Sequence, residues 1–342
     1  MTMHRAVVAE QTGGTEVLHL TDRTSTDPGP GEVRVRIVVS GVNPTDCKVR
    51  RGERPGQPLG VVLHQDGAGT VDAVGPGVDL QVGQRVWVWE AAWQRTDGTA
   101  QDLLVLPAEQ VVPLPEEASY DLGASLGIPA LTAHRCLTVA EGGPDRLGPG
   151  ALDGRTVLVA GGAGAVGHAA IQLARWSDAT VLTTVSSPAK ALLAQTAGAH
   201  HAVDYTVGDT AAAIRAIVPG GVDVVVEVAP GPNAALDLAV VAPGATIAVY
   251  AVDGAPELTL PIRPHMVLGT RWQFVMVYTV PRTTKLHAVA DVSVAVAAGV
   301  LPVGESAGLP LHRFALADTA AAHEAVDRHV VGKVLIDLLP DV

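Results

Sequence analysis

The stretch that decides the fold is Thr156 to Trp176, TVLVAGGAGAVGHAAIQLARW, in which a glycine turn joins two apolar runs. Gly162, Gly164 and Gly167 in this turn have the spacing G-x-G-x-x-G. Between a strand and a helix this spacing suits a dinucleotide pyrophosphate, because glycines allow close backbone approach and the helix N-terminus offers unpaired N–H groups. A glycine-rich connection without any ligand has the same spacing, so the interpretation depends on the surrounding chain.

From Thr156 onward, strand-like and helix-like runs alternate along the chain. The strand-like runs are Thr156 to Ala160, Thr180 to Thr184, His201 to Val203, Val222 to Val228, Thr246 to Tyr250 and Phe274 to Tyr278. The helix-like segments begin near Gly164, Pro188, Asp209 and Pro232, and the residues expected to end helices are Gly198 and Gly244. Repeated βαβ units with continuous apolar strands predict a six-stranded, parallel, doubly wound sheet.

The chain before about Gly127 has a different, mostly β pattern. Glu32 to Val39 (EVRVRIVV) alternates apolar and polar residues, and glycine and proline turns separate further short runs, which predicts a compact barrel or bent sheet. The tail from Pro281 is too short for a domain and is expected to pack back onto this region. We therefore predict three segments: 1–127, 128–280 for the cofactor domain, and 281–342.

Composition excludes several classes of function. A length of 342 residues suits two domains, and a formal net charge of −12 disfavours nonspecific binding to nucleic acid or anionic membranes. The two cysteines form no C-x-x-C, the 12 histidines form no spaced ligand set, and no G-x-S-x-G nucleophile motif is present. We expect no metal site and, since no transmembrane run or signal peptide is evident, a cytoplasmic protein.

The end of the second strand-like run indicates which dinucleotide binds. An NAD site would have Asp or Glu there, but no acid lies between Ala179 and Lys190. Ser186, Ser187 and Lys190 suit a 2′-phosphate, so NADPH is favoured over NADH. The two serines are equally suited to capping a helix that starts at Pro188, and both roles are compatible.

Several stretches together resemble the medium-chain dehydrogenase/reductase superfamily, in its zinc-free branch of NADPH-dependent quinone oxidoreductases similar to zeta-crystallin. The matching stretches are GVNPTDCKVRRG (Gly41 to Gly52), QDGAGTVDAVGPGV (Gln65 to Val78), GASLGIPALTAHRCL (Gly123 to Leu137), AIQLAR (Ala170 to Arg175), VDVVVEV (Val222 to Val228) and GKVLIDL (Gly332 to Leu338). The resemblance implies an α/β protein with a Rossmann NADP-binding domain and a GroES-like β-barrel catalytic domain built from both termini.

The resemblance also assigns site residues. Asn43 and Gln65 stand where zinc-dependent relatives have a cysteine and a histidine ligand, which implies a zinc-independent site. Asn43 and Thr132, matching the pair that flanks the nicotinamide, are the predicted catalytic residues. The predicted cofactor-binding residues are Gly162, Gly164, Ala165, Val166, Gly167, Ser186, Ser187, Lys190, Tyr205, Tyr250 and Arg328. Trp93 and Phe274 are assigned to the substrate pocket, although Trp93, clustered with Trp87 and Trp89, is equally suited to an ordinary core.

The resulting hypothesis is an NADPH-dependent reductase (EC 1.6.5 or 1.3.1) that transfers hydride to a quinone or a related activated α,β-unsaturated carbonyl. The alternatives are an enoyl-thioester or polyketide-tailoring enoyl reductase and a non-catalytic NADPH-binding protein. Enoyl-thioester reductases of the superfamily have a tyrosine donor after N-P-x-D, whereas this chain has Arg54 near that position, and it also has an insertion of unknown role, Glu141 to Gly154. We expect a small-molecule substrate and a homodimer paired through the Phe274 to Tyr278 edge.

Overall fold

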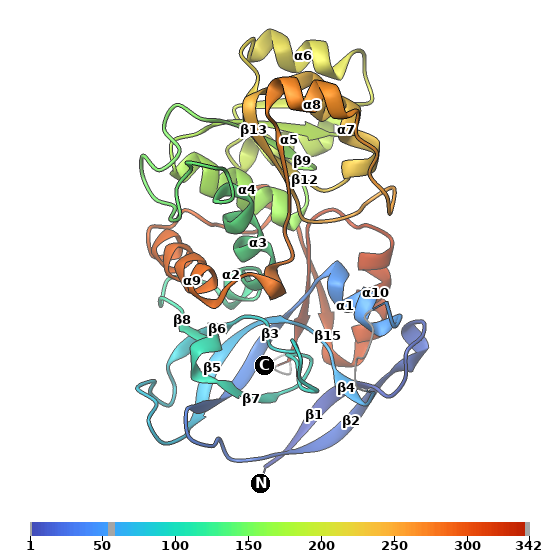
Figure 1. Ribbon diagram of the computed structural model, residues 1–342. Coiled ribbons are helices and arrows are strands. Elements are labelled where there is room, and N and C mark those ends of the chain that lie inside the picture. Colours follow the sequence, from blue (N-terminus) through green and yellow to red (C-terminus); the bar gives the residue numbers. More distant parts are fainter. Residues whose placement is uncertain (1, 54–58, 339–342) are drawn as a thin grey trace. The chain divides into compact units, whose positions relative to one another are not determined.

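The computed structural model describes residues 2–53 and 59–338, so that Arg54 lies outside the described residues. The chain divides into two compact units (Figure 1). The first contains residues 1–128 together with the segment from Pro310 onward, and the second contains residues 129–309.

The second unit is built on a six-stranded parallel sheet with the order β11-β10-β9-β12-β13-β14. Its strands are β9 (Thr156–Ala160), β10 (Thr180–Val185), β11 (His201–Asp204), β12 (Val222–Glu227), β13 (Val241–Val249) and β14 (Arg271–Phe274). The central strands are apolar and almost wholly buried, as expected for a parallel sheet between helical layers. The predicted Rossmann sheet is confirmed.

Most helices of this unit begin where the sequence predicts. The helices are α3 (Gly127–Leu137), α4 (Ala165–Trp176), α5 (Pro188–Thr196), α6 (Thr210–Ile217), α7 (Pro230–Val240), α8 (Ile262–Leu268) and α9 (Arg282–Ala297). Asp209 caps α6 by accepting a hydrogen bond from the backbone N–H of Ala212, at 3.0 Å. Gly244 does not end a helix: α7 ends at Val240, and Gly244, with φ +78°, lies inside β13 where the register with β12 shifts.

The last strand lies earlier in the chain than predicted. β14 ends at Phe274, and residues 277–279 form a 3₁₀ turn instead of a strand. The final ladder bond joins the N–H of Val275 to the carbonyl of Val249, at 2.7 Å, after which Val277 and Tyr278 turn inward and are buried. β14 does form an edge of the sheet, and the homodimer paired there stays a prediction.

Helix α9 belongs to the second unit, although the sequence pattern assigned it to the C-terminal catalytic segment. Asp291 of α9 explains its position. Its carboxylate is 2.8 Å from His134 Nε2 on α3, and it also accepts hydrogen bonds from Arg146 and from the backbone N–H of Leu147, at 2.8 Å. The last two residues lie in the insertion Glu141 to Gly154, so part of that insertion fastens α9 to its unit.

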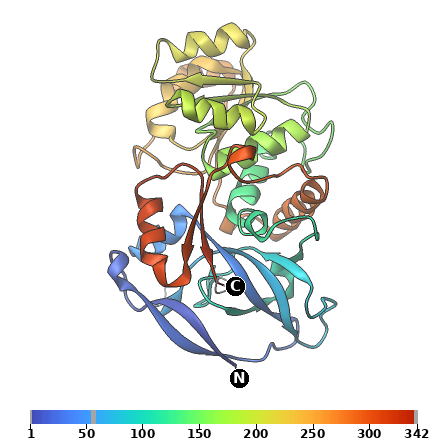
Figure 2. The same cartoon turned by 180° about the vertical axis from the view of Figure 1, so that it is seen from behind.

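The first unit contains a seven-stranded sheet and a three-stranded sheet, mostly antiparallel. The strands are β1 (Thr2–Ala9), β2 (Leu18–Ser25), β3 (Glu32–Val42), β4 (Val61–Val62), β5 (Asp66–Val74), β6 (Arg85–Val88), β7 (Leu103–Pro107), β8 (Val111–Pro113), β15 (Leu311–Ala315) and β16 (Lys333–Asp337). Its helices are α1 (Pro44–Arg50), α2 (Tyr120–Gly123) and α10 (Thr319–Asp327). Figure 2 shows the red C-terminal elements beside the blue N-terminal ones, and β16 pairs antiparallel with β3.

A chain of buried polar side chains runs through the core of the first unit. His64 Nδ1 lies 2.9 Å from Ser40 Oγ, and His64 Nε2 lies 2.9 Å from His323 Nε2. On its other side, His323 Nδ1 is 3.4 Å from the Cys47 thiol. Burial lowers the pKa of His323 to about 3 and that of His64 well below its ordinary value, so both rings are neutral at neutral pH.

We expect acid to destabilise the first unit through these histidines. A folded pKa of about 3 for His323, against about 6.5 when unfolded, gives stability that is complete above about pH 6.5 and is lost as the pH falls toward 3. At about pH 5 this one residue should lower the free energy of unfolding by roughly 2 kcal/mol. Urea unfolding at about pH 8 and pH 5 measures the loss, and His323→Gln should reduce it; an equal loss in both proteins would contradict this assignment.

Candidate cofactor-binding and active site

Two glycines of the turn between β9 and α4 are required by the packing of the protein itself. A Cβ on Gly162 would lie 2.2 Å from Thr183 Oγ1 on the neighbouring strand, which accepts a hydrogen bond from the N–H of Gly162 at 3.1 Å. A Cβ on Gly167 would lie 2.5 Å from the carbonyl oxygen of Gly161. These positions hold the first turn of α4 close against the sheet.

Gly164 differs, because the protein leaves room for a side chain there. It has an ordinary φ of −85°, and the nearest atom to an added Cβ, the carbonyl oxygen of Gly161, would be 3.5 Å away. Gly164 is also the N-cap of α4 and supplies no side-chain acceptor to the first turn, which Ala165 and Val166 begin. The open position at a helix N-terminus fits a pyrophosphate, which needs N–H donors and close backbone approach.

The end of β10 brings together the residues predicted to hold a 2′-phosphate. Lys190 Nζ donates a hydrogen bond to Ser186 Oγ at 2.8 Å. Ser187 has a different function, because its hydroxyl accepts a hydrogen bond from the backbone N–H of Lys190, at 3.3 Å, and caps α5. An ammonium and a hydroxyl next to each other fit the charge and hydrogen-bonding needs of a phosphate.

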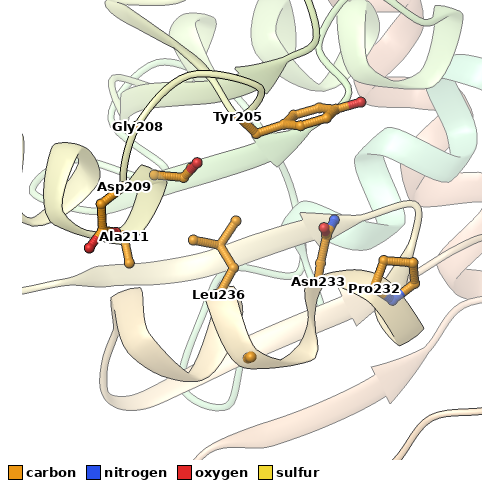
Figure 3. A pocket seen from close by; sticks show the side chains of 9 residues that line it. Tyr205, Gly208, Asp209, Ala211, Pro232, Asn233 and Leu236 are labelled. Carbon is orange, nitrogen blue, oxygen red and sulfur yellow. The ribbon is translucent and has the colours of Figure 1, made fainter.

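A pocket of about 690 Å³ lies near the C-terminal ends of the parallel strands (Figure 3). One side is formed by Tyr205, after β11, and by residues 208–211 at the start of α6; the other side is formed by α7, including Pro232, Asn233 and Leu236. Of these residues, the sequence predicted only Tyr205 as a cofactor-binding residue. The pocket and the Ser186–Lys190 pair follow the C-terminal ends of parallel strands, where ligands bind in open α/β sheets.

Beneath the pocket lies a buried pair of acids that the sequence analysis missed. Glu227 ends β12, and its Oε1 accepts hydrogen bonds from the backbone N–H of Ala229, at 2.5 Å, and from Asn233 Nδ2, at 3.0 Å. Burial raises the pKa of Glu227, and burial together with the neighbouring Glu227 raises that of Asp237 well above its ordinary value. Tyr250 follows β13 and donates its backbone N–H to the carbonyl of Glu227, at 3.0 Å.

In the first unit, Asn43 is held by two buried charged side chains. Its Nδ2 donates to Asp66 Oδ2 at 2.7 Å, and its Oδ1 accepts from Lys333 Nζ at 2.7 Å. Asp66 Oδ1 accepts from the backbone N–H of Ile128, at 2.8 Å, and Asp66 Oδ2 is 3.4 Å from Lys333 Nζ. Since the amide has an anionic acceptor on one side and a cationic donor on the other, its orientation is fixed.

The remaining predicted residues are distributed over the two units. Thr132 is buried on α3, and the Phe274 side chain is largely exposed at the end of β14. In the first unit, Trp93 is partly buried after β6, and Arg328 follows α10, where it donates to Glu324 at 2.9 Å. Gln65 is buried and accepts a hydrogen bond from the backbone N–H of Ala92 at 3.1 Å.

Over residues 2–53 and 59–338, the structure contains no group of three or more His, Cys, Asp or Glu side chains placed to hold a metal ion. Over the same residues, no helix is both long enough and apolar enough to cross a membrane.

Comparison with known proteins agrees with this architecture. Residues 29–116 match the alcohol dehydrogenase GroES-like domain, and residues 165–294 match the family described as zinc-binding dehydrogenase. The chain is 30% identical to a 2-haloacrylate reductase from Burkholderia sp. over 353 residues, which covers 98% of this chain and 99% of that protein. It is also 30% identical to a quinone oxidoreductase from Rattus norvegicus over 258 residues, covering 74% and 75%.

Two further likenesses differ in extent. The chain is 31% identical to the synaptic vesicle membrane protein VAT-1 homolog of Rattus norvegicus over 274 residues, which are 78% of this chain but only 64% of that protein. A solved mycobacterial structure complexed with NADPH is 28% identical, with a TM-score of 0.82. The match covers 98% of this chain and 100% of the mycobacterial chain.

A Rossmann sheet with a glycine-rich first turn, joined to a GroES-like β unit, defines the class of two-unit dehydrogenases and reductases. Within that class, the chain belongs to the medium-chain dehydrogenase/reductase family, among its quinone oxidoreductase-like members.

We expect Lys333→Met to destabilise the first unit strongly. The substitution removes the ammonium and leaves the Asp66 carboxylate buried without its cation, which should cost about 3 kcal/mol or more in the free energy of unfolding. Urea unfolding measures the change, with Lys48→Met on α1 as the control. Adding Asp66→Asn to Lys333→Met should recover part of the loss, and a Lys333→Met protein as stable as the control would refute the role of the charge.

Proposed function

We propose that this chain is an NADPH-dependent, zinc-independent oxidoreductase that transfers hydride to a quinone or a related activated α,β-unsaturated carbonyl compound. The observation that carries the proposal is the Ser186–Lys190 pair at the end of β10, beside a glycine turn with room for a pyrophosphate. The NADPH complex of the mycobacterial structure and the rat quinone oxidoreductase support the same cofactor and reaction class.

In this proposal, residues of the second unit hold the pyrophosphate, the 2′-phosphate and the purine of the cofactor. The N-terminus of α4 would hold the pyrophosphate, and Ser186 and Lys190 would hold the 2′-phosphate. The purine would enter the pocket between Tyr205 and α7. The bound reduced nicotinamide supplies the hydride, and the protein contributes binding and orientation. Asn43 and Thr132 remain the residues that we propose beside the nicotinamide.

The chemistry of hydride addition supports the proposed substrate class. A quinone needs little acid catalysis, because the anion formed is delocalised and takes its proton from water. The 2-haloacrylate reductase that matches nearly the whole chain has an activated α,β-unsaturated acid in its name, which favours an activated C=C bond as a further acceptor. A trans-enoyl reductase from Penicillium crustosum, 33% identical over 63% of this chain, supports the alternative of an enoyl reductase.

Zinc independence is supported by the two amides at the positions that zinc-dependent relatives use for ligands. Asn43 is bound to Asp66 and Lys333, and Gln65 accepts a backbone hydrogen bond. Neutral amides that are already hydrogen-bonded within the protein are poor substitutes for thiolate and imidazole.

We expect the purified protein to oxidise NADPH in the presence of a simple benzoquinone, and to do so equally well after treatment with a strong zinc chelator. Absorbance of reduced nicotinamide at steady state and in a single turnover measures the rate. A simple enone, 2-chloroacrylate and crotonyl-CoA tested in parallel define the acceptor. Oxidation with crotonyl-CoA alone would support the enoyl reductase, tight NADPH binding with no turnover would support the binding protein, and loss of activity with the chelator would contradict zinc independence.

We expect Lys190→Ala to weaken NADPH binding about tenfold or more and to change NADH binding much less. A charge-assisted hydrogen bond to the 2′-phosphate is lost, and NADH has no phosphate there. Fluorescence titration with each dinucleotide gives both dissociation constants. The matched control is Lys285→Ala on α9, whose ammonium donates to the carbonyl of Tyr278, and it should affect neither. Equal losses for NADPH and NADH would refute the assignment of the 2′-phosphate.

A further inference from the structure

The pair of acids under the pocket, Glu227 and Asp237, is fully buried. Apart from the contact between the two carboxyl groups, Glu227 Oε2 and Asp237 Oδ2 have no hydrogen-bond partner among the described residues. Two such carboxyl groups cannot both ionise in a low-dielectric interior, so the pair retains one proton between these oxygens. The other oxygen of Glu227, Oε1, carries no proton and only accepts hydrogen bonds, from the backbone N–H of Ala229 and from Asn233 Nδ2.

This acceptor fixes the amide of Asn233. Asn233 lies one helical turn before Asp237 on α7 and faces the same strand end. Because Asn233 Nδ2 donates to Glu227 Oε1 at 3.0 Å, the carbonyl Oδ1 is turned away from Glu227. Figure 3 shows the Asn233 side chain pointing from α7 toward Tyr205, so the amide presents a hydrogen-bond acceptor to the pocket that it lines.

The rest of the pocket lining also favours a ligand that donates hydrogen bonds. Among the described residues that line the pocket, the ionisable groups are the Tyr205 phenol and the Asp209 carboxylate, and none is a Lys or an Arg. Pro232, Leu236 and the Tyr205 ring supply apolar surface. Such a lining suits an uncharged flat ring that donates hydrogen bonds, and it is unsuited to a phosphate or to a ring that presents a carbonyl at the same position.

Building on the proposed use of NADPH, we propose that Asn233 Oδ1 accepts a hydrogen bond from the exocyclic amino group of the cofactor's adenine, and that Glu227 and Asp237 are positioning residues that hold the amide in this orientation. The site then selects an amino purine against the matching oxo purine. With hypoxanthine in place of adenine, two carbonyl oxygens would face each other without a hydrogen between them.

The experiment compares binding of NADPH with that of its reduced hypoxanthine analogue, by fluorescence titration, for five proteins. The unaltered protein should prefer NADPH by about tenfold, the effect of one lost hydrogen bond with an unpaired acceptor. Asn233→Ala should reduce the preference to about twofold or less. Leu236→Ala, on the same wall, should weaken both ligands alike and leave the ratio unchanged.

Two substitutions at Glu227 separate positioning from simple structural support. Glu227→Gln keeps a carbonyl oxygen for the same two donors and an N–H₂ group for Asp237, so the preference should be retained. Glu227→Ala releases the amide and should lower the preference severalfold, while thermal unfolding reports whether the variant is folded. A ratio that falls equally in both variants would overturn the positioning role.

The outcomes distinguish this inference from the proposed function. If the unaltered protein does not bind NADPH, the proposed function fails. If it binds NADPH but does not discriminate against the hypoxanthine analogue, or if Asn233→Ala keeps the discrimination, the proposed function stands and the inference is overturned.

Discussion

The first unit depends on the burial of one ammonium group. An ammonium without solvent must be neutralised and hydrogen-bonded, and Lys333 meets this need with Asp66 and Asn43. Lys333 is the first residue of β16, Asp66 is the first residue of β5, and Asn43 immediately precedes α1. One electrostatic requirement therefore joins three segments that are far apart in the chain. The same contacts fix the orientation of the Asn43 amide, which we propose at the active site.

The second unit also buries ionisable groups, which here are two acids and not an ammonium. Glu227 and Asp237 are buried near the strand ends where the pocket of Figure 3 lies, and a proton retained by the pair would let both carboxyl groups remain there. In both units a buried charged or protonated group determines how a neutral amide is turned, Asn43 in one and Asn233 in the other. An amide has nearly the same shape in its two orientations, so only its partners can determine which face it shows to a ligand.

Local patterns predicted the Rossmann sheet, because the period of apolar residues and the positions of caps are properties of short segments. The same patterns failed for FVMVY, residues 274–278, which has the composition of a strand. Its register places Phe274 and Met276 in solvent and Val275 and Val277 inside, and the backbone leaves the ladder after Val275. Hydrophobicity alone does not show where an edge strand loses its neighbour.

The polar networks were beyond the reach of local patterns. Lys333 and Asn43 are 290 residues apart in sequence, and Lys333 and Asp66 are 267 apart. Both lysine and aspartate lie in stretches that carried the family resemblance, but nothing in either stretch indicates that the two side chains meet. At Asn233 the sequence shows only a helix start, and its partner Glu227 has the pattern of an ordinary strand end. Their roles depend on burial, which only the folded chain shows.

The placement of β16 has a consequence for how the protein is made. β16 lies inside its sheet, between β15 and β3, whereas the second unit is a single continuous segment. On the ribosome, residues 129–309 can therefore fold as soon as they emerge. On the side of β3 opposite β5, residues 32–36 can already pair with β7, but residues 39–42 stay unpaired until residues 333–337 have been translated. Asp66 and Asn43 likewise have no contact with the Lys333 ammonium until these residues have been translated. Between the translation of residue 309 and that of residues 333–337, the nascent chain would carry a complete second unit together with a first-unit sheet that still lacks β16. The β-rich unit is exposed to aggregation until β16 has joined it.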